Sequence, residues 1–282
     1  MLRSLFAGIS GLRVNQTMLD VTGNNIANAN TTGFKSSTTV FSDTLSQMLT
    51  AASAENAGRG GTNPIQIGLG VQVAATNANF GQGSAQVTNV PTDLMLSGDG
   101  FFVVRDGAEN VYTRAGAFTF DEAGSLVSPT GMRVQGYEIA ADGTRGTDLE
   151  DVTLDFTHLG LPAGTTLKSY NIGSDGKVRG VFSDGSQHDI AQIAIADFVN
   201  PMGLEKVGDT AFRESANSGP AQVGIAGEGT RGQIRSGALE MSNVDLSQEF
   251  TNLILAQRGF QASSRVITTS DQVLEELVNI KR

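Results

Sequence analysis

The sequence contains no cysteine and no tryptophan, and only three of its 282 residues are tyrosine. The absence of cysteine excludes a disulfide framework and thiolate chemistry. It fits a protein that works outside the cell without oxidative folding, and it fits equally a cytosolic protein that lacks the residue by chance. Few large aromatics beside 35 glycines favour short strands joined by many turns.

Charge is scarce as well: charged residues make up 17% of the chain, with a formal net charge of −10 and no cluster of Lys or Arg. Because phosphates are repelled by an acidic surface, we expect no nucleic-acid partner. No run of about 18 apolar residues is present, so we expect no membrane insertion. Gly8 and Arg13 interrupt the apolar start of the chain. We therefore expect that any export proceeds without a cleaved signal peptide.

No pattern of reactive residues indicates catalysis. The two histidines, His158 and His188, do not form a metal-ligand pattern, and His188 fits a turn that precedes a strand. The stretch Gly227-Glu-Gly-Thr-Arg-Gly has the spacing of a dinucleotide-binding fingerprint but not its strand-to-helix context. We interpret it as a glycine linker into the last helix. The sequence predicts no enzyme, no metal and no cofactor.

The first thirty residues carry apolar side chains at alternating steps of three and four residues. This spacing is a heptad pattern, which predicts an amphipathic helix with one apolar stripe. The residues that we expect to form an assembly interface on this helix are Leu2, Leu5, Ile9, Leu12, Leu19 and Ile26.

The last forty residues show a second heptad pattern. A helix from about Asp245 to Ile280 would be roughly 50 Å long at about 1.5 Å per residue, which is typical of a coiled-coil-like rod. Asn243 or Asp245 is a candidate cap for its start. The expected interface residues on this helix are Leu246, Phe250, Leu253, Phe260, Ile267 and Leu274.

Between these helices the sequence is typical of β-structure. Short apolar runs such as Phe101-Phe-Val-Val and Ile190 to Phe198 alternate with Asp-Gly pairs, which are strong turn signals. We predict an α+β protein. A discontinuous, coiled-coil-like helical layer comes from both termini, and a central antiparallel domain resembles a sandwich or barrel. The expected divisions are 1–30 with 240–282 (helical), 31–75 (extended linker) and 76–239 (β domain).

Asparagine is unusually frequent near residue 25. Its side chain competes for backbone groups, so it is a weak helix former. We interpret Asn28 and Asn30 as the end of the helix. For Asn24 and Asn25 two readings stay open, namely helix capping and polar contacts between copies of the chain. The residues assigned to the helix end and the start of the linker are Asn24, Asn25, Asn28, Gly33 and Phe34.

A pair of terminal helices buries only one apolar seam within a single chain. The remaining apolar rows need partners, and other copies of the chain are the simplest source, since each buried Leu contributes about 1.5–3 kcal/mol. The sequence therefore predicts self-assembly. The alternatives are a monomer whose two helices form a closed antiparallel pair and a binding module in which the helices form a stalk.

Several stretches together resemble the bacterial flagellar rod and hook protein family, in the family's order and over nearly the whole chain. They are Ser10-Gly-Leu, Gly23 to Lys35, Asp93 to Val103, Tyr112 to Phe118, Ser236 to Leu246 and Ala256 to Gln261. The stretches Asn200 to Gly208, Phe212 to Gly219 and Ser264 to Asp271 look most like the hook protein in a compact form, because the chain has little room for an additional outer domain.

The resemblance implies a structural subunit of the flagellar hook, polymerised into a helical tube that acts as a flexible joint between rod and filament. The implied alternative is a subunit of the distal rod, a rigid drive shaft. The implied partners are other copies of the chain, the rod and hook–filament junction proteins, the hook cap protein and the flagellar type III export apparatus. The implied location is the basal body and hook, outside the cell.

Overall fold

A computed structural model describes residues 2–55, 60–140, 142–157 and 165–280 of the chain. The chain divides into two compact units. The first, here called the helical unit, comprises residues 1–27, 36–79 and 244–282; the second, the β unit, comprises 28–35 and 80–243. Each unit therefore combines segments that are far apart in the sequence. The predicted α+β class is confirmed.

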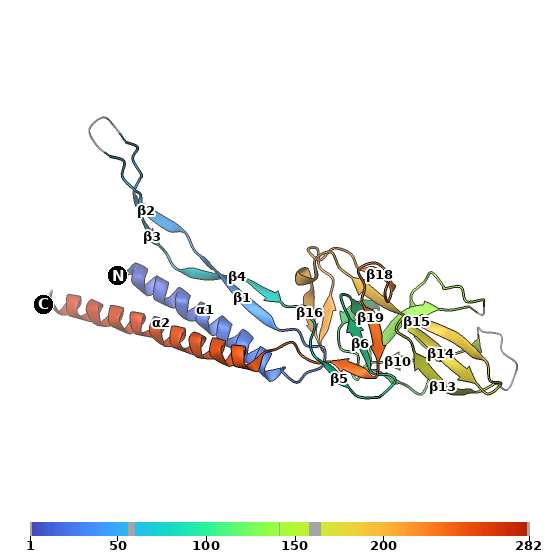
Figure 1. Cartoon of the computed structure of the whole chain (residues 1–282). Coiled ribbons are helices and arrows are strands. Elements are labelled where there is room, and N and C mark those ends of the chain that lie inside the picture. The colour runs from blue at the N-terminus through green and yellow to red at the C-terminus, as the bar shows by residue number, and fades with distance from the viewer. Residues whose placement is uncertain (1, 56–59, 141, 158–164, 281–282) are drawn as a thin grey trace. The chain divides into compact units, whose positions relative to one another are not determined.

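Two helices from opposite ends of the chain form the body of the helical unit (Figure 1). α1 spans Leu2–Ala27 and α2 spans Leu246–Ile280. The cap of α2 is Asp245, whose Oδ1 accepts hydrogen bonds from the backbone N–H groups of Ser247 (2.8 Å) and Gln248 (3.2 Å). This carboxylate satisfies donors that the first turn of a helix leaves unpaired. The predicted span of the second helix is confirmed.

The segment expected to be an extended linker is a long antiparallel hairpin in the described residues. Its strands are β1 (Ser37–Asp43), β2 (Ser46–Thr50), β3 (Ile65–Gly68) and β4 (Val71–Ala78). β1 pairs with β4 and β2 pairs with β3. The stem contacts α1, since the backbone N–H of Val71 donates to Ser10 Oγ at 3.3 Å. The hairpin is thus part of the helical unit. Residues 56–59, between β2 and β3, lie outside the described residues.

The described residues of the β unit form many strands, most of them short, and the 3₁₀ turn η2. Their bounds are β5 Ala85–Val87, β6 Leu94–Ser97, β7 Phe101–Asp106, β8 Glu109–Thr113, β9 Thr119–Phe120, β10 Leu126–Val127, β11 Arg133–Glu138, β12 Glu150–Asp151, β13 Leu167–Ile172, β14 Lys177–Phe182, β15 Gln187–Asp197, η2 Pro201–Gly203, β16 Glu205–Gly208, β17 Ala211–Arg213, β18 Gln222–Ile225, β19 Gln233–Ser236 and β20 Ala238–Glu240.

The main sheet of this unit is antiparallel, with the order β13-β14-β15-β11-β7-β8-β17-β16; β18 also pairs with β15, and β10 and β12 pair with β11. β7 contributes side chains to two apolar clusters of the β unit. Successive side chains of a strand face opposite ways, and Phe102 and Val104 join one apolar cluster whereas Phe101 and Val103 join another. The apolar run starting at Phe101 is therefore buried on both faces.

Most of the Asp-Gly pairs form turns as predicted; Asp99-Gly100 does not, and Asp99 instead forms a parallel bridge with Arg231. Gly107 joins β7 to β8, Gly176 joins β13 to β14, and Gly185 joins β14 to β15, each with φ between 61° and 84°. Glycine adopts this left-handed conformation without strain. The interpretation of residues 227–232 as a linker into the last helix is wrong. They form the turn between β18 and β19. β18 pairs with β15 and β19 pairs with β6, so the chain stays within the β unit after this turn.

Candidate functional site

The antiparallel contact between α1 and α2 uses small residues at several levels. Ser4 Oγ lies 3.4 Å from Ser270 Oγ near one end, and Asn25 Nδ2 donates to Glu249 Oε1 at 3.1 Å near the other. Between them, a Cβ added to Gly8 would lie 3.1 Å from Ile267 Cγ1, and one added to Gly11 would lie 2.9 Å from Ser263 Oγ. Glycine at these levels lets the two helices approach closely.

The predicted stripe on α1 is only half-buried within the chain. Leu5, Ile9, Leu12, Leu19 and Ile26 are each partly exposed, and the side chain of Leu2 lies outside the described residues. Among the described side chains of α1, the one large apolar side chain that is buried is Val14, at 6% exposure. The chain therefore covers this stripe in part.

The predicted stripe on α2 is less covered still. Leu246 and Phe250 are exposed, at 43% and 52%. The other predicted positions are half-buried: Leu253, Phe260, Ile267 and Leu274. Small residues at Ala256 and Gly259 face α1 instead, with Ala256 fully buried and Gly259 against Asn15.

The heptad reading missed a second set of exposed apolar residues on the same unit. A wider search for large apolar residues off the heptad positions would have found several of them. On the helices they include Phe6, Ile254 and Leu255, and on the hairpin they include Phe41, Leu45, Met48, Leu49, Ile65 and Ile67. The helical unit thus presents apolar side chains around both helices and along the hairpin.

The asparagines have different surroundings. Asn25 is buried, and besides its bond to Glu249 it accepts from the Ser37 backbone N–H (3.0 Å) and donates to the Ser37 carbonyl (2.8 Å). It therefore fastens α1 to the hairpin within one chain. Asn24 is exposed. α1 ends at Ala27 as predicted, and Asn28 Oδ1 accepts a bond from Thr31 Oγ1 at 3.0 Å in the following turn.

Gly33 and Phe34 belong to the β unit. Gly33 has φ +69°, and a Cβ there would collide with the backbone of Ala115, so no other residue fits without a shift. The Gly33 N–H donates to the Glu240 carbonyl at 2.8 Å. Phe34 is buried beneath Lys206, whose Nζ lies 5.1 Å from the ring centroid. These contacts fix the segment that follows α1.

A buried ion cluster joins three distant segments of the β unit, and the sequence patterns did not reveal it. Lys35 Nζ lies 2.7 Å from Glu240 Oε1, and Arg114 Nη1 lies 3.5 Å from Glu240 Oε2, with all three side chains at most 2% exposed. Lys35 also donates to the Gly81 carbonyl, and the Gly83 N–H donates to Glu240. Burial lowers the pKa values of Lys35 and Arg114, although the Glu240 charge opposes the shift.

The sequence offered one hint of this cluster, namely the position of its three residues within the family motifs. Lys35, Arg114 and Glu240 each lie in a different one of the motif stretches that carry the family resemblance. Charges in such stretches do not reveal their partners, because the partners are up to 205 residues apart in the sequence.

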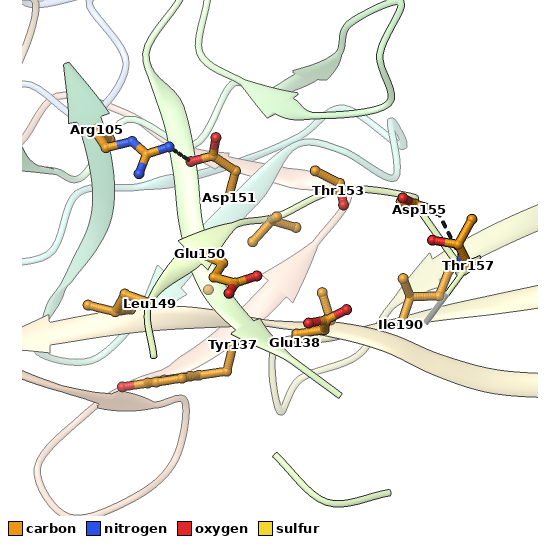
Figure 2. A pocket seen from close by; sticks show the side chains of 13 residues that line it. Arg105, Tyr137, Glu138, Leu149, Glu150, Asp151, Thr153, Asp155, Thr157 and Ile190 are labelled. Carbon is orange, nitrogen blue, oxygen red and sulfur yellow. Dashed lines mark hydrogen bonds and ion pairs between the residues drawn. The ribbon is translucent and has the colours of Figure 1, made fainter. Parts of the chain in front are cut away.

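A pocket of about 360 Å³ opens on the β unit beside β11 and β12 (Figure 2). Asp151 is its best-placed acid, and its carboxylate is bonded to Arg105 (2.5 Å), Arg133 (3.0 Å) and Gln135 (2.6 Å). Burial acts to raise the pKa of Asp151, but the bonds from Gln135 and Arg133 and the charge of Arg105 outweigh it, so the pKa is lowered. An ionised, fully engaged carboxylate of this kind is a structural group.

The described residues also lack a cluster of metal ligands and a membrane-spanning helix. They contain no group of three or more His, Asp or Glu side chains arranged to hold a metal ion. His188 is a strand residue of β15 whose ring lies 6.0 Å from that of Phe182, and His158 lies outside the described residues. Within those residues, neither helix has a stretch apolar enough to cross a lipid bilayer.

Three family models match separate parts of the chain. They are described as flagella basal body rod protein (residues 5–35), flagellar hook protein FlgE/F/G D1 domain (95–180) and flagellar basal body rod FlgEFG protein C-terminal (235–280). The flagellar basal-body rod protein FlgG of Bacillus subtilis is 45% identical, and the match covers 100% of both chains. The chain belongs to the flagellar rod and hook protein family.

Other members of the flagellar family match over the same extent. The rod protein FlgG of Borreliella burgdorferi is 35% identical, and the hook protein FlgE of the same organism is 32% identical, each with 100% of both chains covered. These relatives are structural proteins of the flagellum, and the chain is not an enzyme.

Proposed function

We propose that this chain is a subunit of the flagellar basal-body rod, which polymerises with identical copies through the apolar faces of its helical unit. The observation that carries the proposal is the exposure of large apolar side chains on both helices of a chain whose buried apolar residues lie almost entirely in the β unit. Phe6, Ile254 and Leu255 are each 56–64% exposed. Each such residue gains about 1.5–3 kcal/mol when a neighbour covers it.

Chain length favours the rod over the hook. The alignment with the Bacillus rod protein extends over 283 positions, close to the 282 residues of this chain. The alignment with the Borreliella hook protein extends over 441 positions while it includes the whole of both chains. The hook relative therefore carries a large amount of sequence that this chain lacks.

The hook is the second candidate, and one observation favours it. The hook protein of Borreliella matches this chain from end to end, so its additional sequence is an insertion into a shared frame. A compact hook subunit would have the length seen here. In either structure the expected neighbours are copies of the chain and adjoining rod or hook–filament junction proteins; the hook cap protein applies to the hook alone.

In the assembled structure, the twelve residues expected from the sequence at the interface would lie between copies. Leu253, Phe260 and Ile267, which are half-buried in the single chain, would become fully buried against neighbouring helices. A tube built in this way requires delivery of subunits to its growing end. We propose that the chain is exported by the flagellar type III apparatus without a cleaved signal peptide.

The test is polymerisation of the purified chain, followed by light scattering and electron microscopy. The proposal expects concentration-dependent tubes that are straight and rigid. Curved tubes of the same protein would support the hook instead. A solution that stays monodisperse at high concentration, with the helices protected from proteolysis, would overturn assembly through the helical unit.

A further inference from the structure

The two helices of the helical unit do not end at the same level. Ser4 is opposite Ser270, and the helices run antiparallel with equal rise per residue. α2 therefore passes Leu2, the first residue of α1, near Gln272 and continues to Ile280. We call residues 274–280 the α2 overhang. In Figure 1 this end of α2 lies beyond the start of α1.

The α2 overhang is apolar on one side and acidic beside it. Leu277, Val278 and Ile280 are 48%, 67% and 80% exposed. With Val273 and Leu274 they form one stripe, because positions three and four apart share a helix face. Glu275 and Glu276 are exposed, and among the described residues neither has an ion-pair partner. An apolar stripe with acidic flanks and no cover is what this end of the helix presents.

A groove of about 420 Å³ lies between α1 and the hairpin stem. It is apolar like the α2 overhang, but its charge is of the opposite sign. Its apolar walls include Phe6, Ile9, Leu69 and Val73. Arg13, which is exposed, is its one charged lining residue, and its guanidinium has no ion pair among the described residues. The lining extends from Phe6 to Thr17 on α1, about 16 Å, whereas the overhang is about 9 Å long. The groove is therefore long enough to hold the overhang.

The overhang of a chain does not reach that chain's own groove. α2 packs along α1 and points past its first residue, while the groove begins at Phe6 and runs the other way. Filling it from within would require α2 to turn back on itself, and no Pro or Gly follows Gly259 to permit a sharp bend. The occupant that the geometry allows is the overhang of another copy.

We propose that the α2 overhang of one copy docks in the groove between α1 and the hairpin of a neighbouring copy, with Glu275 or Glu276 facing Arg13. This inference rests on the proposed function and specifies one of its contacts. The apolar stripe supplies the affinity, and the opposite charges fix which copies meet, since charge complementarity acts mainly on specificity. The sequence ends in Lys281 and Arg282, beyond the described residues.

Cysteine cross-linking tests the contact directly, because the natural chain has no cysteine. Gln72→Cys places a thiol in the groove and Glu276→Cys places one on the overhang. Two preparations, each with one of these substitutions, are mixed, polymerised and oxidised. If the proposed contact forms, we expect a disulfide-linked dimer between the two variants as the main product. Asp20→Cys, on α1 outside the groove, is the matched control for Gln72→Cys and is expected to give at least tenfold less.

Charge reversal gives an independent readout. Arg13→Glu and the double variant Glu275→Lys with Glu276→Lys are each expected to raise the critical concentration for polymerisation about tenfold, and their combination in one chain is expected to restore most of the loss. Lys168→Glu, an exposed site in the β unit, should leave it unchanged. Polymers that form normally but give no cross-link and no charge rescue would overturn this contact while the proposed function stands. Absence of polymer from the unmodified chain would contradict the proposed function itself.

Discussion

The two units of the chain bury their apolar residues to very different degrees. Nearly all of the buried apolar residues among the described ones belong to the β unit, and only Val14 and Ala256 belong to the helical unit. The large exposed apolar residues are distributed the other way: all but five of them lie on the helical unit. Soluble monomers rarely expose apolar surface on this scale. The β unit has an apolar core of its own, whereas most of the apolar surface of the helical unit is left for other molecules to cover.

The difference extends to charge. The β unit encloses Lys35, Arg114 and Glu240 with almost no solvent contact. A buried charge is tolerated only when it is paired and bonded, so this unit is stabilised by internal contacts. Among the described residues, the helical unit exposes all of its charged side chains except that of Glu249. Substitutions in the β unit should therefore affect folding, and those in the helical unit should affect assembly.

The largest effect is expected from Glu240→Gln. The change removes the one negative charge of the cluster, so that Lys35 loses its ion-pair partner and Arg114 keeps only the charges of Asp99 and Asp197 to oppose the cost of its burial. We expect the β unit to lose about 3–5 kcal/mol of unfolding free energy. Chemical denaturation followed by circular dichroism measures it. Glu205→Gln, at an exposed pair with Arg213, is the control and should cost under about 1 kcal/mol. Equal losses for the two variants would contradict a special role for the cluster.

Leu253→Asp and Phe260→Asp should act on assembly instead. Each puts a charge on a surface that we propose to be covered by neighbouring copies, and each loses about 2 kcal/mol of apolar burial, which corresponds to a roughly thirtyfold higher concentration for polymerisation. Sedimentation of polymers gives the measurement, and denaturation of the β unit should be unchanged. Motility and assembly at the normal level in cells that carry either variant would count against the interface.

A smaller effect is expected from Asp245→Ala. The substitution removes the side-chain acceptor for the N–H groups of Ser247 and Gln248. A lost N-cap costs about 1 kcal/mol of helix stability. Hydrogen exchange in the first turn of α2 should become faster, and Asp245→Asn should retain most of the protection. If the alanine and asparagine variants exchanged at the same rate, the cap would not be what holds this end.

The last effect is confined to alkaline pH and leaves stability at neutral pH unchanged. Burial, and secondarily the charge of Glu214, raises the pKa of Tyr112 to about 12, above its ordinary value of 10.0. The unfolded chain therefore ionises this phenol first. The stability that Tyr112 contributes is present below about pH 10 and is lost as the pH rises toward 12. Comparing denaturation of the natural chain with that of Tyr112→Phe at pH 9 and pH 11 isolates this loss. A difference that does not change with pH would refute it.

Local features of the molecule could be read from the sequence because neighbouring residues fix them. The heptad spacing predicted α1 and α2, since side chains three and four positions apart share a helix face. The Asp-Gly pairs predicted turns because glycine alone enters the left-handed region without strain. The apolar run at Phe101 predicted a strand, though not that both of its faces would be buried.

What only the tertiary structure decided are pairings between distant segments. Residues 31–75 carried no signal that they would form a hairpin whose stem packs on α1, because strand pairing depends on a partner rather than on local spacing. The heptad stripe did not reveal that Gly8, Gly11 and Ala256 would lie between the helices. The cluster of Lys35, Arg114 and Glu240 is decided in the same way: each charge is affordable inside the protein only because folding brings the other two beside it.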